Sequence, residues 1–285
     1  MKKLTQVISA VPARDGDGVK IQRLAGRHLQ QVMNPFLMID EINSDDAADY
    51  IGGFPEHPHR GFETITYMKA GRMRHRDHMG NEGVISTGDV QWMTAGAGVL
   101  HAETPEQAQG LLHGFQLWLN LPAAEKMQAA KYREIKSEDI PEQVLAGGGV
   151  VRVIAGSAMI DAEPLVGPSA GLSTKPVFLD VQLNANETVE LLVKESNSAL
   201  VYVYEGSTET LASRQLGVYQ NDELLHLQGG PEGVGLLVLS GEVINEPLVQ
   251  YGPFVMNTSE EIKQAMQDFQ NPSYIKQLKS GTVEG

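Results

Sequence analysis

Apolar and polar residues alternate in short runs along most of the first half of the chain. The runs are rich in β-branched and aromatic side chains, and glycine or small polar residues separate them. This pattern is typical of half-buried strands joined by tight turns. It predicts strands at residues 64–68, 83–85, 90–93 and 114–119, with turns at 69–71, 86–89 and 96–98. Short strands at such close spacing predict an antiparallel sandwich or barrel.

The second half returns to the same pattern after an interruption. Residues 122–131 combine an initial proline with good helix formers, which predicts a helix that links the two halves. Strands are then expected at five apolar runs: 150–154, 177–183, 188–193, 200–204 and 234–239. A last helix should begin at a cap on Thr258 or Ser259 and end before Pro272.

Two pairs of candidate metal ligands lie in the first half. His57 and His59 form one pair, His101 and Glu103 form the other, and one residue separates the members of each. Side chains at i and i+2 of a strand point to the same face, so each pair can direct both members at one point. Two such strands side by side would offer three imidazoles and one carboxylate to one cation. That donor set suits a divalent transition metal and leaves octahedral positions open for a substrate or dioxygen.

The residues around these pairs refine the prediction. Glu63 lies an even number of residues from both histidines of the first pair, so an unbroken strand would place it on their face. It could be a ligand, an acceptor that fixes an imidazole tautomer, or a proton carrier. Pro58 cannot donate to a sheet, which predicts an edge or the start of a strand. Gly96 and Gly98 permit the tight turn that would bring in the second pair.

The other histidines give weaker signals. His75 and His78 accompany a locally basic segment, residues 72–76, which we expect to be a solvated turn or strand face rather than a nucleic-acid patch. A charged rim that attracts an anionic substrate is the functional alternative. His28 and His113 are isolated, and we expect structural or surface positions for all four.

Composition narrows the classes of function. A chain of 285 residues can form two domains, each with its own core. The formal net charge of −14 argues against direct binding to a phosphate backbone. No apolar run approaches the roughly 18 residues of a membrane helix, so no membrane partner is expected. The chain has no cysteine, which excludes disulfides and thiolate ligands and fits a cytoplasmic protein. We expect a monomer, because two barrels can cover each other.

The motifs resemble those of a known family. The first histidine pair, with Glu63 four residues later, resembles the first cupin motif, and residues 88–101 resemble the second. More specifically, five segments are similar to pirins: 34–41, 57–64, 88–96, 98–103 and 245–258. The resemblance extends from about residue 5 to about residue 270.

The resemblance implies an all-β fold of two jelly-roll type cupin barrels in tandem, with a linking helix and a C-terminal helix. Pirins have an iron-binding N-terminal barrel and a metal-free C-terminal barrel. We therefore expect a metal-binding cupin domain at residues 1–135 and a metal-free cupin domain with the C-terminal helix at residues 136–285. The histidine distribution agrees independently, because His226 is the only histidine of the second half.

Carried over by motif, the pirin ligands are His57, His59, His101 and Glu103. They would hold one Fe(II) per chain, although other divalent transition metals also accept these donors. The general cupin pattern uses the glutamate at position 63 as a ligand, whereas pirins do not. We therefore place Glu63 behind the ligands.

The leading functional hypothesis is a dioxygenase of the flavonol (quercetin) 2,3-dioxygenase kind, an activity that the resemblance implies for several pirins. A small aromatic substrate such as a flavonol would bind the metal through its 3-hydroxyl and 4-carbonyl oxygens, and Glu103 or Glu63 would take the hydroxyl proton. Dioxygen would then open the heterocycle with loss of carbon monoxide. We expect the apolar cavity walls to include Phe54, Phe62, Trp92 and Met93.

Two alternatives belong to other classes. The chain could be an iron- or redox-responsive regulatory protein that acts through protein–protein contacts, as a transcriptional cofactor or a modulator of a metabolic enzyme. Any effect on DNA would then be indirect. A structural metal ranks last, because structural zinc is usually held in a closed tetrahedral set of Cys and His.

Overall fold

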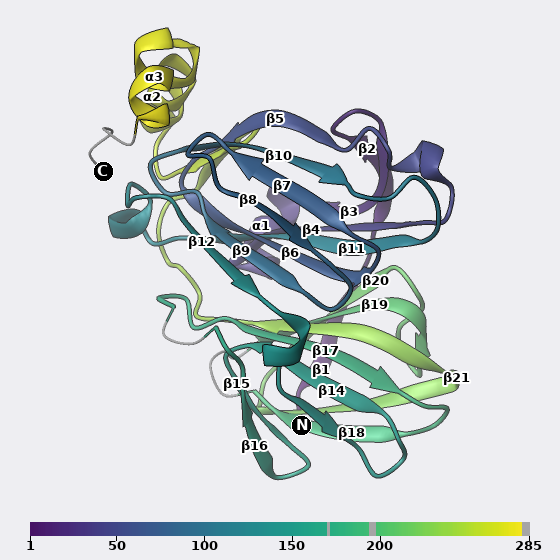
Figure 1. Ribbon diagram of the computed structural model, residues 1–285. Helices are drawn as coiled ribbons and strands as arrows, with labels where there is room; N and C mark the ends of the chain where they lie inside the picture. The colour runs from purple at the N-terminus through teal and green to yellow at the C-terminus, as the bar shows by residue number, and fades with distance from the viewer. Residues whose placement is uncertain (170–171, 194–197, 281–285) are drawn as a thin grey trace. The chain divides into compact units, whose positions relative to one another are not determined.

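The structure is a computed structural model, and the residues described are 1–169, 172–193 and 198–280 (Figure 1). Strands dominate it, as the sequence predicted, and each predicted strand overlaps an observed one. The chain forms two compact units. Unit 1 consists of Met1–Val11, Arg27–Pro35 and Glu138–Val243, and unit 2 of Pro12–Gly26, Phe36–Ser137 and Ile244–Gly285.

These units differ from the two continuous domains that we predicted, residues 1–135 and 136–285. The change from one half to the other falls near the predicted boundary, between Ser137 and Glu138. However, each end of the chain joins the unit formed mainly by the opposite half. Strand pairing explains this at the N-terminus, because β1 (Lys3–Ser9) pairs with β20 (Gln215–Gln220). Sequence periodicity cannot reveal a pairing over such a separation.

Unit 2 contains two larger antiparallel sheets and a hairpin. The strands of the first sheet are, in spatial order, β12 (Lys131–Ile135), β9 (Val90–Thr94), β6 (Phe62–Ala70), β11 (Leu112–Asn120), β4 (Phe36–Ser44), β3 (Val19–Ala25) and β2 (Val11–Asp15). Those of the second are β5 (Phe54–His59), β10 (Val99–Pro105), β7 (Met73–Asp77) and β8 (Glu82–Ile85). The hairpin is β22 (Val249–Tyr251) with β23 (Phe254–Met256). The predicted edge position of Pro58 is confirmed, because β5 pairs only with β10 in its sheet.

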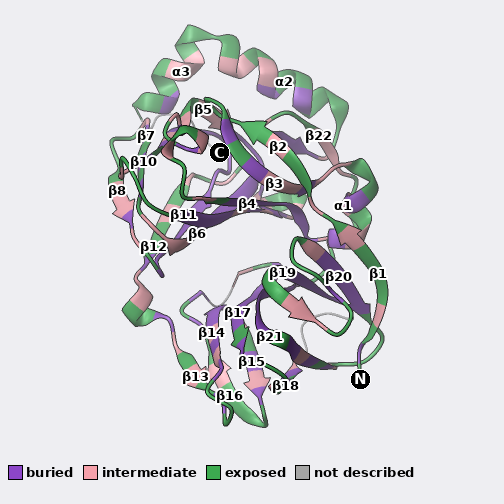
Figure 2. Cartoon of the chain, turned by 90° about the vertical axis from the view of Figure 1, so that its right-hand side faces the viewer, coloured by how far each residue is buried: buried purple, intermediate pink, exposed green. Residues whose placement is uncertain are grey.

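Unit 1 is built on one ten-stranded sheet. Its strands are β1, β20, β19 (Ser198–Thr208), β21 (Leu224–Ser240), β17 (Val177–Leu183), β14 (Val150–Ala155), β13 (Glu142–Val144), β15 (Ser157–Ile160), β16 (Glu163–Val166) and β18 (Thr188–Leu192). Buried valine and leucine side chains fill its core. Figure 2 marks the buried stretches of its strands in purple. Runs of apolar residues without alternation, as in β17, are buried on both faces.

The helix predicted at residues 122–131 is wrong. That segment contains only the 3₁₀ turn Ala123–Glu125, and β12 begins at Lys131. The tertiary contacts of Lys126 override the local helix propensity. Its ammonium is buried and donates hydrogen bonds to the carbonyl oxygens of Gly61 and Val255, at 2.7 and 3.2 Å, and to Oδ1 of Asn120.

The C-terminal helix is confirmed. α2 (Ser259–Gln270) begins after a capping box in which Thr258 and Glu261 satisfy each other's backbone N–H groups. It ends before Pro272, where the unpredicted α3 (Pro272–Lys279) begins. The other helical segments are α1 (Arg27–Met33) and the 3₁₀ turns Ala47–Asp49 and Ser137–Asp139. Among the described residues, no helix has the length and apolar character needed to cross a membrane.

Candidate metal centre

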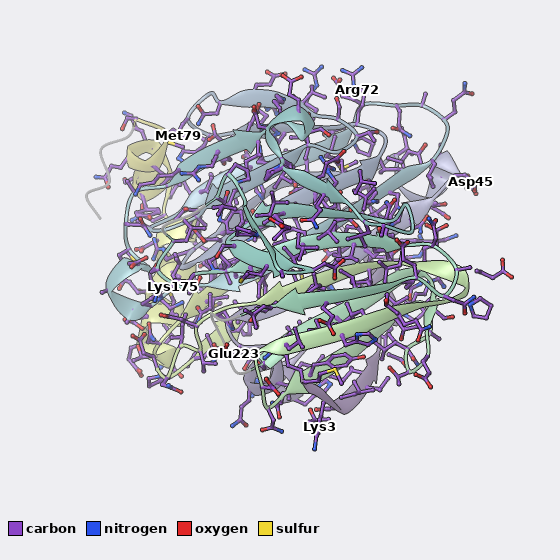
Figure 3. The ribbon with its side chains drawn as sticks, turned by 90° about the horizontal axis from the view of Figure 1, so that it is seen from below. Lys3, Asp45, Arg72, Met79, Lys175 and Glu223 are labelled. Carbon is purple, nitrogen blue, oxygen red and sulfur yellow. The ribbon has the colours of Figure 1, made fainter. Side chains whose placement is uncertain are left out.

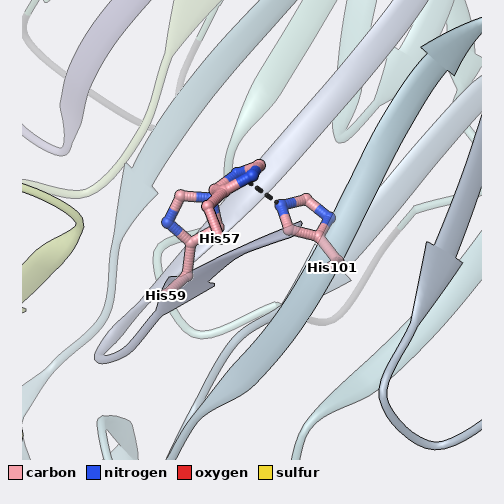
Figure 4. A group of neighbouring side chains, drawn as sticks. All are labelled: His57, His59 and His101. Carbon is pink, nitrogen blue, oxygen red and sulfur yellow. Dashed lines mark hydrogen bonds between the residues drawn. The ribbon is translucent and has the colours of Figure 1, made fainter. Parts of the chain in front are cut away.

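β5 and β10 bring the two predicted ligand pairs side by side. The strands pair antiparallel with His101 opposite His57. The turn before β10 uses Gly96 and Gly98 at φ values of +52° and +154°, as their sequence position predicted. The Nε2 atom of His57 consequently lies 2.9 Å from Nε2 of His59 and 3.0 Å from Nε2 of His101 (Figure 4).

The nitrogens of the three rings are placed better for binding a metal ion than for hydrogen bonding to one another. Nδ1 of His57 lies 2.9 Å from the carbonyl oxygen of Pro55, so Nδ1 carries the proton and Nε2 presents a lone pair. One lone pair cannot accept well from both of its neighbours. A cation at the common point would instead be bound by Nε2 of all three rings. Their ligand atoms lie within 4.8 Å of one another, which suits this geometry.

Burial keeps these imidazoles in the form that binds metal. His59 is 3% exposed and His101 is 1% exposed. Desolvation lowers the pKa of both rings well below the usual value, and repulsion between neighbouring imidazoles lowers it further. Both side chains are therefore neutral near pH 7, and no proton has to be displaced from them before a metal binds.

Glu103 lies on β10 beside this group but outside it. The group of converging donors contains the three histidines only, among the residues that the structure describes. The buried carboxylate of Glu103 accepts hydrogen bonds from Oγ1 of Thr66 at 3.1 Å and from Nε2 of Gln116 at 2.9 Å. Desolvation raises its pKa. The assignment of Glu103 as a fourth ligand stays a prediction.

Glu63 has a different environment. Its carboxylate accepts hydrogen bonds from Nε1 of Trp92 at 3.0 Å and from Oγ1 of Thr94 at 2.6 Å, and these bonds connect β6 to β9. Burial raises its pKa. No described contact joins Glu63 to the histidines. The structure therefore gives it a role within the sheet, and its predicted role as a proton carrier has no contact to support it.

A cavity of about 410 Å³ borders His57, His59 and Glu103. Phe54 forms part of its wall, as predicted. The other three predicted wall residues do not border it and are buried in the core: Phe62, Trp92 and Met93. Trp118 is the aromatic wall that sequence analysis missed, with its ring centroid 5.4 Å from that of His59.

The sequence analysis also missed the polar residues of the cavity. Arg23, Asp40 and Gln116 all border it. Arg23 and Asp40 each have apolar residues two positions away on both sides, and Gln116 lies between Phe115 and Leu117. A polar residue at such a position was the available signal. Whether it would face a cavity or a partner could not be decided, because that depends on strand order.

Arg60, which follows His59, connects the site to the C-terminal helices. Its guanidinium is buried and donates hydrogen bonds to the carbonyl oxygen of Ala97 at 2.6 Å, to Asp268 at 2.8 Å and to the hydroxyl of Tyr274. It also lies 5.3 and 5.2 Å from the ring centroids of Phe269 and Tyr274. Because Ala97 precedes β10, one side chain holds the turns next to both ligand strands.

The remaining histidines do not join the centre. His75 was expected in an exposed turn, but it is buried on β7, and its Nε2 lies 3.1 Å from Glu134. His78 accepts a hydrogen bond from the backbone of Leu100, and His113 contacts Glu41. These are structural positions, as predicted.

The basic segment is a strand face, as predicted. Arg72 reaches the surface (Figure 3) and forms an ion pair with Glu106. Arg74 forms ion pairs with Glu82 and Glu106. These carboxylates offset the charge of two of the three arginines in the segment.

Comparisons with known proteins agree with this geometry. The profile of the Pirin family matches residues 18–119, and that of the Pirin C-terminal cupin domain matches residues 178–275. A Pseudomonas aeruginosa protein provisionally named quercetin 2,3-dioxygenase is 45% identical over 267 residues, which cover 91% of this chain and 93% of the relative. A pirin-like protein of Caulobacter vibrioides is 41% identical over 277 residues, or 95% and 98% of the two chains.

A solved structure agrees as well. The crystal structure of quercetin 2,3-dioxygenase from Acinetobacter baumannii superposes with a TM-score of 0.87 at 35% identity. The match covers 96% of this chain and 98% of that one. Extensive identity over nearly the whole length, with two cupin domains and histidines at the expected positions, leads to one conclusion. This chain belongs to the pirin family.

Proposed function

We propose that this protein is a metal-dependent flavonol 2,3-dioxygenase that uses Fe(II) and dioxygen to open the ring of a quercetin-like substrate with release of carbon monoxide. One observation carries the proposal: the imidazoles of His57, His59 and His101, the last two buried, converge beside a cavity. That cavity, at about 410 Å³, falls in the size range of sites for small organic ligands. The relatives named for quercetin dioxygenase activity support the same reaction.

The histidines and Glu103 have separate roles in this proposal. His57, His59 and His101 hold the metal, and Glu103 is the fourth ligand or lies just behind it. When bound, the metal supplies a Lewis acid that lowers the pKa of a flavonol hydroxyl and a place where dioxygen can react. The Glu103 carboxylate accepts the proton of the 3-hydroxyl. Its raised pKa suits this task, because a more basic carboxylate is the better proton acceptor.

The surroundings of Glu103 and the cavity walls support the chemistry. Thr66 and Gln116 hydrogen bond to the Glu103 carboxylate and fix its direction. Phe54 and Trp118 provide apolar walls that can pack against an aromatic substrate and exclude water. We further propose that the protein acts as a cytoplasmic monomer, without a direct nucleic-acid or membrane partner, as its charge and cysteine-free composition suggest.

The test is anaerobic reconstitution with Fe(II), followed by addition of quercetin and dioxygen. We expect loss of the flavonol absorbance together with carbon monoxide release, dependent on the metal. Parallel reconstitution with Mn, Ni, Cu and Zn identifies which metal supports turnover. Tight iron binding without turnover of quercetin would contradict the proposal and favour the regulatory alternative. A comparison of the partners bound by the ferrous and ferric protein would then follow.

A further inference from the structure

A second polar group borders the cavity of the metal centre. Arg23 on β3 lies directly opposite Asp40 on β4 in the strand register. Its Nε and Nη2 atoms donate to the two carboxylate oxygens of Asp40 at 2.8 and 2.6 Å, and Nη2 also donates to Asp15. All three residues border the cavity. We call them the Asp40 triad.

The triad lies within an apolar face of two neighbouring strands. The cavity-lining residues of β3 and β4 are every second one along each strand: Ile21, Arg23 and Ala25, then Met38, Asp40 and Ile42. Because residues at i and i+2 share a face, both strands direct these side chains to the cavity. An apolar residue therefore flanks the ion pair on each side along both strands. Such a surface suits a flat ring that carries a polar substituent.

The charged side chains that border the cavity determine which polar substituent of a ligand can bind there. The guanidinium of Arg23 carries one positive charge that is already shared by the carboxylates of Asp15 and Asp40. Glu103 adds a third carboxylate to the cavity wall. An anionic ligand group would meet excess negative charge, and no guanidinium without a partner would be available for it there. A hydroxyl group can instead donate to a carboxylate, since each carboxylate has about four acceptor positions and Arg23 uses two on Asp40.

We propose that Asp40, held in place by Arg23, is the specificity-determining acceptor for a ring hydroxyl of the substrate. The cavity then selects neutral aromatic compounds that carry hydroxyl groups away from the metal-binding oxygens, and it rejects compounds with a carboxylate or sulfate there. This inference rests on the proposed function, because it presumes that the cavity holds the aromatic substrate. It goes further by naming the substituent pattern and the residue that reads it.

The test is anaerobic binding, which needs no turnover. Quenching of tryptophan fluorescence is measured with 3-hydroxyflavones that bear no, one or two hydroxyls on the pendant ring, and with one that bears a carboxylate there. Trp118 borders the cavity and reports on occupancy. We expect about tenfold tighter binding for the hydroxylated compounds than for the unsubstituted one, as one hydrogen bond to a charged acceptor gives. The carboxylate compound should bind more weakly than the unsubstituted one.

Asp40→Asn removes the negative charge and should reduce the hydroxyl preference severalfold while improving binding of the carboxylate compound. The matched control is Asp49→Asn. Asp49 belongs to an ion pair with Lys20 but does not border the cavity, so both preferences should persist. Asp15→Asn is the second variant in case Asp40→Asn fails to fold, because Asp15 is half-exposed and its loss leaves the core intact. It should also improve binding of the carboxylate compound, by a smaller factor than Asp40→Asn does.

Equal affinity for all four compounds in the unmodified protein would overturn the inference. So would equal behaviour of the Asp40 and Asp49 variants. The two proposals can fail separately: a hydroxyl preference without quercetin turnover removes the dioxygenase and keeps the Asp40 triad. Quercetin turnover with equal affinity for all four compounds would keep the dioxygenase and reject the role of the Asp40 triad.

Discussion

The interiors of the two units are filled in opposite ways, although both units are built from antiparallel strands. Among its described residues, unit 1 has a hydrophobic cluster of 22 buried side chains, in which Leu191, Leu236 and Val201 are fully buried. Its buried Asp180 accepts a hydrogen bond from Tyr204. Unit 2 uses its interior for three imidazoles, a carboxylate and a cavity. The same kind of scaffold can therefore be a solid core or a hollow site.

Placing polar groups in the interior of unit 2 costs folding free energy, and local hydrogen bonds offset part of that cost. Buried polar groups destabilise a fold unless they are hydrogen-bonded, and the Glu103 carboxylate meets this condition through Thr66 and Gln116. The imidazoles do not meet it through one another, since the single lone pair on Nε2 of His57 faces Nε2 of both His59 and His101. We infer that a metal bound there would add to the stability of unit 2.

The largest expected effect comes from removing one ligand. His101→Ala should abolish metal binding at equimolar iron and with it all turnover, because the other two imidazoles alone bind weakly. Metal content by mass spectrometry checks this. His226→Ala is the control in unit 1, where His226 is exposed and 3.9 Å from Glu190, and it should leave the metal content unchanged. Equal loss of metal in both variants would contradict the assignment of the metal site to unit 2.

The next effect concerns the solid core. Leu236→Ala in unit 1 removes a fully buried side chain and should lower the free energy of unfolding by about 2 to 5 kcal/mol. Denaturant titration measures the loss. The metal content of the protein that remains folded should stay the same. Val144→Ala, at a position that is 67% exposed, should change stability by less than about 0.5 kcal/mol.

Replacement of the buried arginine should have an intermediate effect. Arg60→Met keeps much of the apolar stem but removes three hydrogen bonds, and it should cost about 2 kcal/mol because Asp268 remains partly exposed to water. It should also speed the loss of iron to a chelator. Arg60→Lys should restore part of both properties. An unchanged rate of iron loss would show that the turns at residues 60 and 97 need no support.

The last effect is a pH dependence, which is the smallest when stability is compared one pH unit apart. Burial lowers the pKa of Lys126 to about 7, whereas an unfolded lysine titrates near 10.5. Between these values the unfolded chain binds more protons, so Lys126 makes stability rise with pH by up to about 1.4 kcal/mol per unit. Below pH 7 this contribution is constant. Lys126→Met should lose this rise, and parallel stability curves for the two proteins between pH 7 and 10 would contradict the assignment.

Short-range patterns were sufficient to predict much of this structure. The period of two in His57 and His59 placed that pair together because a strand fixes that geometry. The same period in His101 and Glu103 did not do so, because the pairing with β5 shifts register between them and Glu103 lies outside the group. The run at residues 177–183 coincides with β17, and the capping residues of α2 were visible in the sequence.

The rest depended on contacts between distant parts of the chain. Lys126 was counted as a helix former, but its ammonium donates to the carbonyl oxygens of Gly61 and Val255, and the segment forms only a 3₁₀ turn. Arg60 and Asp268 are 208 residues apart, and no local sequence pattern predicts that they form an ion pair. The register that sets Arg23 against Asp40 likewise follows from strand order, which periodicity does not determine.

Each end of the chain belongs to the unit formed mainly by the opposite half, and this affects when each unit can fold during synthesis. A ribosome makes the ligand strands β5 and β10 early, but the helices that contact Arg60 come last. Strand β1, although made first, has no partner until β20 has emerged. Unit 1 therefore needs β20 and β21 before it is complete, and unit 2 needs α2 and α3, in contrast to proteins with continuous domains that fold one after another during translation. A nascent chain that stalls before α2 would hold its ligand histidines on an unfinished scaffold, so metal binding to the finished site has to follow the synthesis of the C-terminal helices.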